Sequence, residues 1–327
     1  MVQTLSPQVS WSPRPKRAKR TVAMGKWAFF EDEFVPLEDA KVGVATHALN
    51  YGTGCFGGVR AYWNEQEQQL YVFRIKKHFV RFLESCKLLN IFLDYDVDDL
   101  SNIVLELLRR ENYHQDAYVR PLAYKSTEDI TPRLYDLDDS FTCFTRPQGN
   151  YIKLEVRAAV SSWRRVDDNS IPARGKITGA YVNSAFARSE AHWNGYDEAI
   201  VLNQDGHVSE GSAENIFLVR HDQLVTPPVK DNILEGITRS TIMELASKEL
   251  GLPVLERTVD RSELYVADEA FFTGTGAQVA AIVEVDHRPI GGGATGPWTK
   301  KIQDLYFRTV RGNNPKYKHW LTPVYDR

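Results

Sequence analysis

A lysine flanked by glycines is the first sign of chemistry in this sequence. Residues 172–181 read PARGKITGAY, so Lys176 directly follows Gly175 and precedes a second glycine, Gly179. A lysine that only contacts water has no need of such a setting, whereas an amine that reacts with a carbonyl group needs space and a lowered pKa. The segment therefore indicates a reactive amine, with the glycines leaving room for a bound cofactor.

Two glycine-containing segments and one arginine have the residue types that bind phosphate. Residues 234–239 (LEGITR) place a glycine before an amphipathic helix, so the amides of Ile237 and Thr238 can face an anion at the positive helix end. Residues 271–278 (FFTGTGAQ) carry a strand into a turn whose amides can form an anion-binding nest. Arg81 lies off the apolar side of its helix and could hold phosphate with two hydrogen bonds. Ordinary helix capping and a solvated arginine are the alternatives.

An acidic segment completes the set. Residues 207–217 (HVSEGSAENIF) place Glu210 and Glu214 beside a turn that leads into a buried strand, where a carboxylate needs a partner. That partner is a backbone amide, an arginine or the protonated ring nitrogen of a cofactor. A lysine for a Schiff base, a carboxylate for a pyridine nitrogen and amides for a phosphate are together the requirements for holding pyridoxal 5′-phosphate.

Five segments, in this order, resemble the class IV (fold type IV) pyridoxal-phosphate-dependent aminotransferases, most closely the branched-chain amino-acid aminotransferases. The segments are THALNYGTGCFGGVR, KITGAY, VSEGSAENIF, LEGITR and FTGTGA, and the likeness runs from Trp27 to Gln303. The resemblance implies a two-domain α+β fold, with a small N-terminal α/β sandwich domain and a larger C-terminal pseudo-barrel, as in the D-amino-acid aminotransferases. It also implies a homodimer with active sites at the interface.

The resemblance gives each matched position a role. Lys176 would be the catalytic Schiff-base lysine, Tyr181 would contact the phenolic oxygen of the cofactor, and Glu210 would pair with its pyridine nitrogen. Tyr51 would reach into the partner subunit. The other cofactor-binding positions would be Arg81, Leu234, Gly236, Ile237, Thr238 and Thr275. The substrate-binding positions would be Tyr51, Phe56, Gly58, Arg60, Tyr118, Arg120, Gln148, Tyr151, Gly276 and Ala277.

These roles imply transamination by a ping-pong mechanism. The amino group of L-leucine, L-isoleucine or L-valine would pass to 2-oxoglutarate, so small amino donors and 2-oxo acids are the expected partners. Phe56, Tyr118 and Tyr151 would suit the apolar side chain. Arg120 is the candidate for binding the second carboxylate of the acceptor.

Three departures from the family pattern leave other substrates open. Gly57 stands where the family usually has an acid, and Gln148 stands where branched-chain enzymes often have tryptophan. Residues 130–141 (ITPRLYDLDDSF) lack the glycine-containing loop that in the branched-chain group helps bind the substrate α-carboxylate. The alternatives are an R-selective amine transaminase, a mixed-specificity or D-amino-acid transaminase, and an aminodeoxychorismate lyase of the same fold. Tyr118 and Arg120 favour the branched-chain group.

Hydrophobic periodicity predicts the elements that position these residues. The N-terminal half reads as short strands and a hairpin with two amphipathic helices. The C-terminal half is rich in strands without a regular βαβ alternation, which predicts a mostly antiparallel, barrel-like sheet. The expected division is a disordered basic tail at 1–23, a small α+β domain at 24–145, an interdomain loop at 146–151 and a cofactor-binding pseudo-barrel at 152–327.

Composition limits the remaining classes of function. The 327 residues carry a net charge of −3, so no nucleic-acid partner is expected. No apolar run approaches the roughly 18 residues of a membrane helix, so no membrane partner is expected either. The three cysteines are widely separated and lack CxxC spacing, which argues against a disulfide framework or a zinc site and favours a reducing cytoplasm. No metal is expected.

Overall fold

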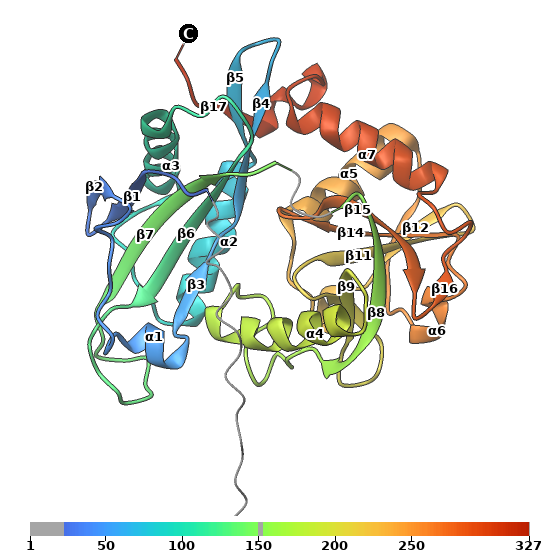
Figure 1. Ribbon diagram of the computed structural model, residues 1–327, viewed down its shortest axis with the longest axis horizontal. Helices are drawn as coiled ribbons and strands as arrows, with labels where there is room; N and C mark the ends of the chain where they lie inside the picture. The colour runs from blue at the N-terminus through green and yellow to red at the C-terminus, as the bar shows by residue number, and fades with distance from the viewer. Residues whose placement is uncertain (1–22, 150–152, 327) are drawn as a thin grey trace, which may run out of the picture.

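The chain folds into two lobes, each built on one β-sheet (Figure 1). The computed structural model describes residues 23–149 and 153–326. Within these residues, the first sheet has the strand order β17-β5-β4-β6-β7-β1-β2, with β3 beside β6. The second sheet has the order β10-β9-β8-β15-β14-β11-β12-β13, with β16 beside β15. The expected α+β architecture with two unlike lobes is confirmed.

The first sheet presents one face to two helices and the other face to the space between the lobes. All its strand pairs are antiparallel. Along β6, Val119 is buried beneath the helices whereas Tyr118 and Arg120 face the other way, because side chains alternate along a strand. The strands are β1 (Trp27–Phe30), β2 (Glu33–Pro36), β3 (Gly54–Phe56), β4 (Val59–Asn64), β5 (Gln69–Phe73), β6 (Ala117–Lys125), β7 (Asp139–Pro147) and β17 (Leu321–Pro323). The helices are α1 (His47–Tyr51), α2 (Ile75–Leu88) and α3 (Val97–Glu111).

The second sheet curls around its own apolar core and is mostly antiparallel, as predicted. The difference lies at β8, which pairs in parallel with both β9 and β15, because helix α4 carries the chain from β8 across to β9. The strands are β8 (Glu155–Arg164), β9 (Glu198–Leu202), β10 (Val208–Gly211), β11 (Asn215–Arg220), β12 (Gln223–Thr226), β13 (Val254–Glu256), β14 (Glu269–Gly274), β15 (Gln278–Val285) and β16 (Arg288–Pro289). The helices are α4 (Tyr181–Trp193), α5 (Ile237–Leu250), α6 (Arg261–Leu264) and α7 (Pro297–Val310), with 3-10 turns η1 (Thr178–Ala180), η2 (Val229–Asp231) and η3 (Pro315–Trp320).

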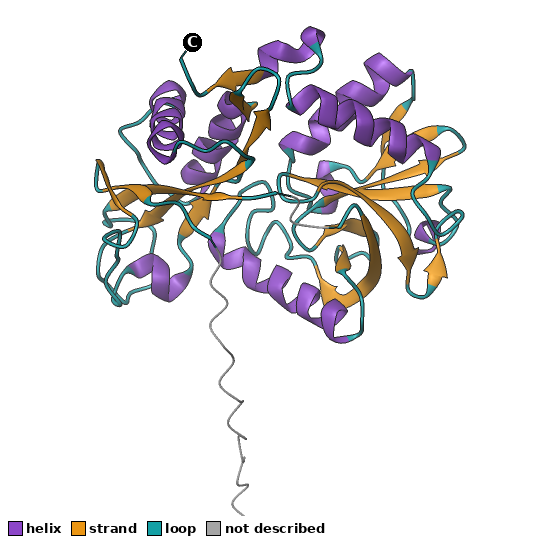
Figure 2. Ribbon diagram, turned by 45° about the horizontal axis from the view of Figure 1, so that its top comes forward, coloured by secondary structure: helices purple, strands orange, loops and turns teal. Residues whose placement is uncertain are grey.

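The two lobes share a packed contact. Helices α5 and α7 lie against each other on one face of the second sheet (Figure 2), and their apolar residues meet side chains of β4 and β5. The chain then returns to the first sheet, where β17 pairs with β5 and the Trp320 ring lies 3.6 Å from the guanidinium of Arg74. The last strand therefore belongs to the first lobe, although the sequence placed it in the second domain. No helix among the described residues is both long and apolar enough to cross a membrane.

Gly57 separates β3 from β4 and has no space for a side chain. A Cβ atom at this position would lie 2.5 Å from Cγ of Pro121, whose ring cannot move aside without distorting β6. We expect Gly57→Ala to lower the free energy of unfolding by about 1–3 kcal/mol, as overpacking does in other proteins. Urea denaturation measures this, with Gly292→Ala as the control because a Cβ there meets nothing. An unchanged stability in Gly57→Ala would contradict the steric explanation.

Candidate active site

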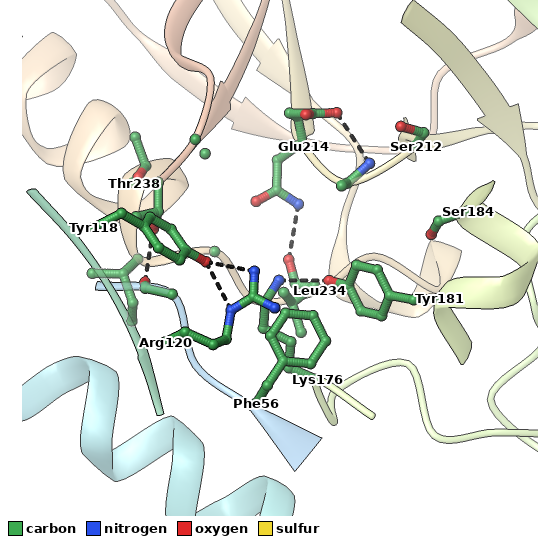
Figure 3. Close-up of a pocket in the computed structure, with 18 of the residues that line it drawn as sticks. Phe56, Tyr118, Arg120, Lys176, Tyr181, Ser184, Ser212, Glu214, Leu234 and Thr238 are labelled. Atoms are coloured by element: carbon green, nitrogen blue, oxygen red, sulfur yellow. Dashed lines mark hydrogen bonds between the residues drawn. The ribbon is translucent and has the colours of Figure 1, made fainter. Parts of the chain in front are cut away.

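A cavity of about 760 Å³ lies between the two lobes (Figure 3). Its size is that of an ordinary small-molecule site. Strands β6 and β7 and helix α2 form one side, and α4, the turn between β10 and β11, the start of α5 and the end of β14 form the other. The predicted site residues that line it are Phe56, Gly58, Arg81, Tyr118, Arg120, Gln148, Lys176, Tyr181, Glu210, Leu234, Gly236, Ile237, Thr238, Thr275 and Gly276.

Lys176 is held by its backbone and projects its amine into this cavity. Its N–H donates to Oγ of Ser85 at 3.1 Å, and its carbonyl accepts from the N–H of Phe56 at 3.0 Å. Its Nζ donates to the Tyr181 hydroxyl at 2.5 Å and lies 5.0 Å from the centre of the Phe56 ring. Segments from both lobes therefore fix the direction of the amine.

The surroundings of Lys176 favour the neutral amine. Burial and then the nearby Arg81 guanidinium lower the pKa of Lys176 to about 7, while Glu210 opposes the shift. Burial also raises the pKa of Tyr181, so its phenol stays neutral at pH 7. An amine with a pKa near 7 can both attack a carbonyl group and exchange protons at neutral pH.

The glycines around Lys176 serve chain packing rather than cofactor space, which corrects the expectation from the sequence. Neither Gly175 nor Gly179 lines the cavity. Gly179 packs on the backbone of Gly52, where its N–H donates to the Gly52 carbonyl at 3.2 Å. A Cβ at Gly175 would lie 2.9 Å from Leu88 of α2. These close approaches hold the lysine segment against the first lobe.

Glu210 is a buried carboxylate at the opposite end of the cavity. Its Oε1 lies 3.0 Å from the guanidinium of Arg165, and its Oε2 accepts from the Asn215 amide and the Leu234 N–H, both at 3.0 Å. Burial raises the pKa of Glu210 and Arg165 opposes that shift. A carboxylate offers about four acceptor positions, so one is left over for a donor in the cavity.

The phosphate-binding elements also meet at this cavity. Helix α5 begins at Ile237 with Gly236 as its N-cap and without a side-chain cap, so its first N–H groups are available to an anion. Arg81 reaches this end from α2, where its Nη1 donates to the Glu235 carbonyl at 3.0 Å. Thr275 donates to the Gly58 carbonyl at 3.1 Å and thereby ties the turn after β14 to the first lobe.

An aromatic and cationic wall faces Lys176 from the first sheet (Figure 3). Arg120 lies 4.5 Å above the centre of the Phe56 ring, and its guanidinium donates to the Tyr118 hydroxyl at 3.1 and 3.3 Å. Within residues 23–149 and 153–326, no carboxylate forms an ion pair with Arg120. Its charge is therefore available to a carboxylate in the cavity.

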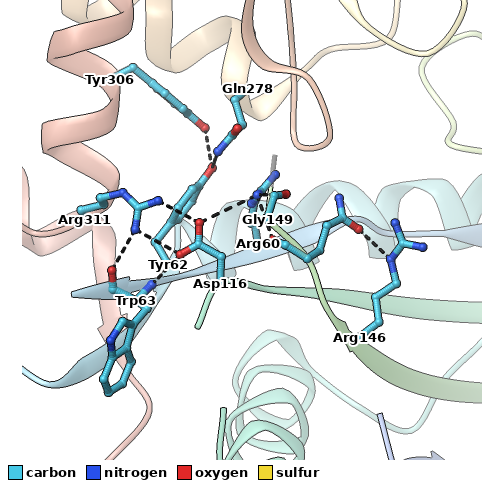
Figure 4. Close-up of polar contacts among 10 residues, drawn as sticks. Arg60, Tyr62, Trp63, Asp116, Arg146, Gly149, Gln278, Tyr306 and Arg311 are labelled. Atoms are coloured by element: carbon cyan, nitrogen blue, oxygen red, sulfur yellow. Dashed lines mark hydrogen bonds and ion pairs between the residues drawn. The ribbon is translucent and has the colours of Figure 1, made fainter. Parts of the chain in front are cut away.

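Arg60 does not line the cavity, in contrast to its expected substrate-binding role (Figure 4). Its side chain is 1% exposed and donates to the carbonyls of Gln148 and Gly149 at 3.0 and 2.6 Å. Asp116 lies 3.9 Å away and binds Arg311 at 2.9 Å. Arg60 therefore positions the interdomain segment, and Arg146 contacts the same segment through a 2.7 Å bond to Gln148.

Three other predicted residues are not brought to the cavity. Tyr51 lies on α1, is 39% exposed and donates to the Ile130 carbonyl, so it faces away from this site. Ala277 is buried behind the turn that Gly276 forms. Tyr151 lies outside the residues that the structure describes, as do residues 1–22 of the basic tail.

Several residues of the site had no individual signal in the sequence. Arg165 and Asn215 hold Glu210, but they lie 45 residues before and five residues after it in the chain respectively. Glu214 also lines the cavity and forms a buried pair with Glu198, and burial followed by the Glu198 charge raises its pKa. The remaining unpredicted lining residues include Met24, Leu122, Phe144, Arg146, Thr178, Ser184, Arg188, Ser212 and Thr273.

The cavity fits pyridoxal 5′-phosphate by its donor set. The Thr273 hydroxyl is buried at the cavity and lacks a hydrogen-bond partner among the described residues, so it can accept one from a ligand. Cationic side chains outnumber acidic ones around the cavity, which suits a phosphate and a substrate carboxylate together. The cations are Arg81, Arg120, Arg146, Arg165, Lys176 and Arg188, and the acids are Glu210 and Glu214.

Comparison with known proteins identifies the class. The family model for amino-transferase class IV matches residues 54–285, well over half of the chain. The chain therefore belongs to the class IV aminotransferases, and it is an aminotransferase.

The resemblance to branched-chain enzymes is confirmed as well. A protein of Aquifex aeolicus (strain VF5) named probable branched-chain-amino-acid aminotransferase is 49% identical over 303 residues, which cover 92% of this chain and 97% of that protein. The branched-chain aminotransferase of Thermoproteus uzoniensis, solved with norvaline, has a TM-score of 0.88 and 47% identity over 92% of this chain and 100% of that chain. A branched-chain aminotransferase from T.th., solved in complex with N-(5′-phosphopyridoxyl)-L-glutamate, has a TM-score of 0.88 and 37% identity over 93% of this chain and 100% of that chain.

Proposed function

We propose that this aminotransferase uses pyridoxal 5′-phosphate to transfer the amino group of L-leucine, L-isoleucine and L-valine to 2-oxoglutarate in a ping-pong cycle. The observation that carries the proposal is the buried Lys176 amine, placed between the Glu210 carboxylate and the uncapped start of α5. The names and ligands of the three relatives support the substrates. The cofactor would supply an aldehyde that accepts the amino group and a ring that withdraws electrons from the substrate Cα.

Lys176 carries the proton transfers in this proposal. With a pKa near 7, its neutral amine can take the Cα proton of the bound amino acid and deliver it again. The Tyr181 hydroxyl at 2.5 Å directs the amine, and the hydrogen bonds to Ser85 and Phe56 keep its backbone in place. Glu210, supported by Arg165 and Asn215, holds a proton on the ring nitrogen.

The phosphate would be held by Arg81, the N–H groups of Ile237 and Thr238, and the hydroxyl of Thr275. These groups come from both lobes, so binding of the phosphate also closes the contact between them. A helix N-terminus together with an arginine provides both a dipole and a full charge for a dianion.

Substrate selection in this proposal depends on one wall of the cavity. Phe56, Leu122 and Phe144 offer apolar surface to a branched side chain, and Arg120 offers a charge to the distal carboxylate of the acceptor. The same space then serves both partners of the ping-pong cycle in turn. Tyr118 keeps Arg120 in place through its hydroxyl.

We expect Arg120→Met to separate the two substrates. The KM for 2-oxoglutarate should rise by about 10- to 100-fold, the value of a lost hydrogen-bonded charge pair, while the KM for L-leucine changes much less. Steady-state kinetics with each substrate varied measures this. Arg133→Met is the matched control, because Arg133 pairs with Asp129 outside the cavity. Equal rises in both KM values would contradict the assignment.

We also propose a homodimer with Tyr51 directed at the partner subunit. Exposed apolar side chains follow α1 and α4, which meet where Gly52 contacts Gly179. A monomer rarely exposes so continuous an apolar strip. Its members are Leu49 (62% exposed), Tyr51 (39%), Trp163 (43%), Val182 (59%) and Phe186 (49%).

We expect Phe186→Glu to weaken this dimer. The Phe186 ring stacks on Trp163 with centroids 4.6 Å apart, so a charge there would disrupt the centre of the apolar strip. Sedimentation velocity should show a dimer for the wild type and monomer for the variant at micromolar concentration. Phe92→Glu is the control, because Phe92 is 77% exposed but lies on the other lobe, away from α4. A wild-type monomer would contradict the proposal.

A cytoplasmic location is the corresponding proposal for the cell. The three cysteines are free thiols in the structure, which suits a reducing compartment. Fractionation of the source cells, followed by detection of the protein, tests this.

The first half-reaction tests the substrate class directly. Protein loaded with pyridoxal 5′-phosphate is mixed with a single amino donor and no acceptor, and the visible absorbance of the bound cofactor is followed. L-leucine, L-isoleucine and L-valine should each remove that absorbance. A response to a D-amino acid or an R-amine alone would favour the other transaminases. Pyruvate release from aminodeoxychorismate without nitrogen transfer would indicate the lyase.

A further inference from the structure

Two of the three cysteines lie side by side behind the lysine. The Sγ atoms of Cys55 on β3 and Cys86 on α2 are 3.4 Å apart, although 31 residues separate them in the chain. Both side chains are buried, at 0% and 2% exposed. This pair was not predicted from the sequence, because widely spaced cysteines argue against a disulfide.

Each cysteine neighbours a residue that holds the backbone of Lys176. Phe56, directly after Cys55, donates its N–H to the Lys176 carbonyl at 3.0 Å. Ser85, directly before Cys86, accepts the Lys176 N–H at 3.1 Å. Cys55 also forms an isolated β-bridge with Ile177. Any covalent link between β3 and α2 at this point would therefore fix the peptide groups on both sides of the lysine.

We propose that Cys55 and Cys86 are a redox-responsive pair that forms an intramolecular disulfide and thereby fixes the backbone of Lys176. A disulfide bond is about 2.0 Å long, so the sulfurs need to approach by little more than 1 Å. Two side chains from a strand and a packed helix can supply this shift without a change in fold. The bond would close a loop between the two cysteines and restrict the unfolded chain.

The oxidant is a small disulfide such as oxidised glutathione. One protein thiolate attacks a glutathione sulfur and releases glutathione thiolate, and the second protein thiolate then attacks the mixed disulfide and releases the second glutathione. Each cysteine loses one hydrogen, and two molecules of reduced glutathione form. The glutathione disulfide is reduced as the protein pair is oxidised.

Access to the pair comes from the end of α2. Cys86 lies in the last turn of this helix, which ends at Leu88, and helix ends open more readily than the core. In the closed state the reaction is slow, because the hydrogen bond with Cys86 and burial raise the pKa of the Cys55 thiol. A reducing cytosol keeps both thiols reduced, and the bond forms when the glutathione pool becomes oxidised.

The test compares the holoenzyme incubated with oxidised or with reduced glutathione, with low urea present to open the helix end. Free thiols are then alkylated in guanidinium, and the protein is digested and analysed by mass spectrometry. We expect a peptide pair linked through Cys55 and Cys86 only after oxidation. Cys143 should be alkylated in both samples and serves as the internal control, because it is buried in β7 away from a second sulfur.

The effect on Lys176 has two readouts. After removal of urea and glutathione, the oxidised protein should have a Tm higher by roughly 5 °C. Its peptide containing Lys176 and Ile177 should also exchange amide hydrogen more slowly than in the reduced protein. Both differences should vanish in Cys86→Ala and persist in Cys143→Ala, each compared with its own reduced form.

Three outcomes would overturn the proposal. Alkylation of all three cysteines after oxidation would show that the pair does not form a bond. A link through Cys143 would show that the pairing is wrong. A Cys55–Cys86 bond that leaves the Tm and the exchange at Lys176 unchanged would show that the bond does not fix the lysine.

Discussion

Lys176→Ala should abolish transamination, lowering kcat by about 10³-fold or more, because the variant lacks both the reactive amine and the group that moves the Cα proton. The side chain projects into a cavity and makes one hydrogen bond, to Tyr181, so its loss should leave the fold intact. Circular dichroism and Tm check the fold, and coupled assays with L-leucine and 2-oxoglutarate measure kcat. Lys300→Ala is the matched control, because Lys300 is 63% exposed and pairs with Asp304 on α7.

A second readout separates the chemistry of Lys176 from a structural role. Borohydride reduction of the loaded wild-type protein should attach the cofactor to the peptide that contains Lys176, as seen by its increased mass. Lys176→Ala should show no such adduct while Lys300→Ala keeps it. An adduct at another lysine, or activity of Lys176→Ala close to that of the wild type, would contradict the assignment.

Glu210→Gln should lower kcat by about 10²- to 10³-fold, the usual cost of losing one well-placed electrostatic contact to the transition state. The amide has nearly the same shape as the carboxylate and can still accept from Asn215 and Leu234, but it cannot hold a proton on a ring nitrogen. Steady-state kinetics gives kcat, and equilibrium titration gives the Kd for pyridoxal 5′-phosphate. We expect kcat to change much more than Kd, because Arg81 and α5 still bind the phosphate.

The matched control for Glu210 is Glu106→Gln. Glu106 lies on the surface of α3 in an exposed pair with Arg110, so its charge has no path to the site. Its kcat should equal that of the wild type. If Glu210→Gln kept full kcat, or if Kd rose as far as kcat fell, the carboxylate would not act on the ring nitrogen.

The sequence predicted the chemistry of the site better than its geometry. Lys176, Glu210 and the start of α5 were recognisable because each depends on a local pattern: a lysine among glycines, a carboxylate before a buried strand, and a glycine before an amphipathic helix. Helix α5 runs from Ile237 to Leu250 as expected, and Gly251 ends it in the left-handed conformation that favours glycine.

Features that depend on tertiary contacts could not be predicted in this way. Arg165 pairs with Glu210 only because β8 and β10 belong to the same curled sheet. The glycines near Lys176 were interpreted as cofactor space, whereas Gly179 packs on Gly52, far away in the chain. Arg60 was assigned to the substrate by family resemblance, but its buried guanidinium holds two backbone carbonyls instead.

The measurement that tests the central claim most directly follows the nitrogen atom itself. Purified protein with pyridoxal 5′-phosphate is given ¹⁵N-labelled L-leucine and unlabelled 2-oxoglutarate, and the products are analysed by mass spectrometry. The proposed function predicts ¹⁵N-labelled glutamate together with an equal amount of the oxo acid of leucine, and neither product with Lys176→Ala. Unlabelled glutamate alone, or no transfer from leucine, isoleucine or valine while another donor reacts, would contradict it.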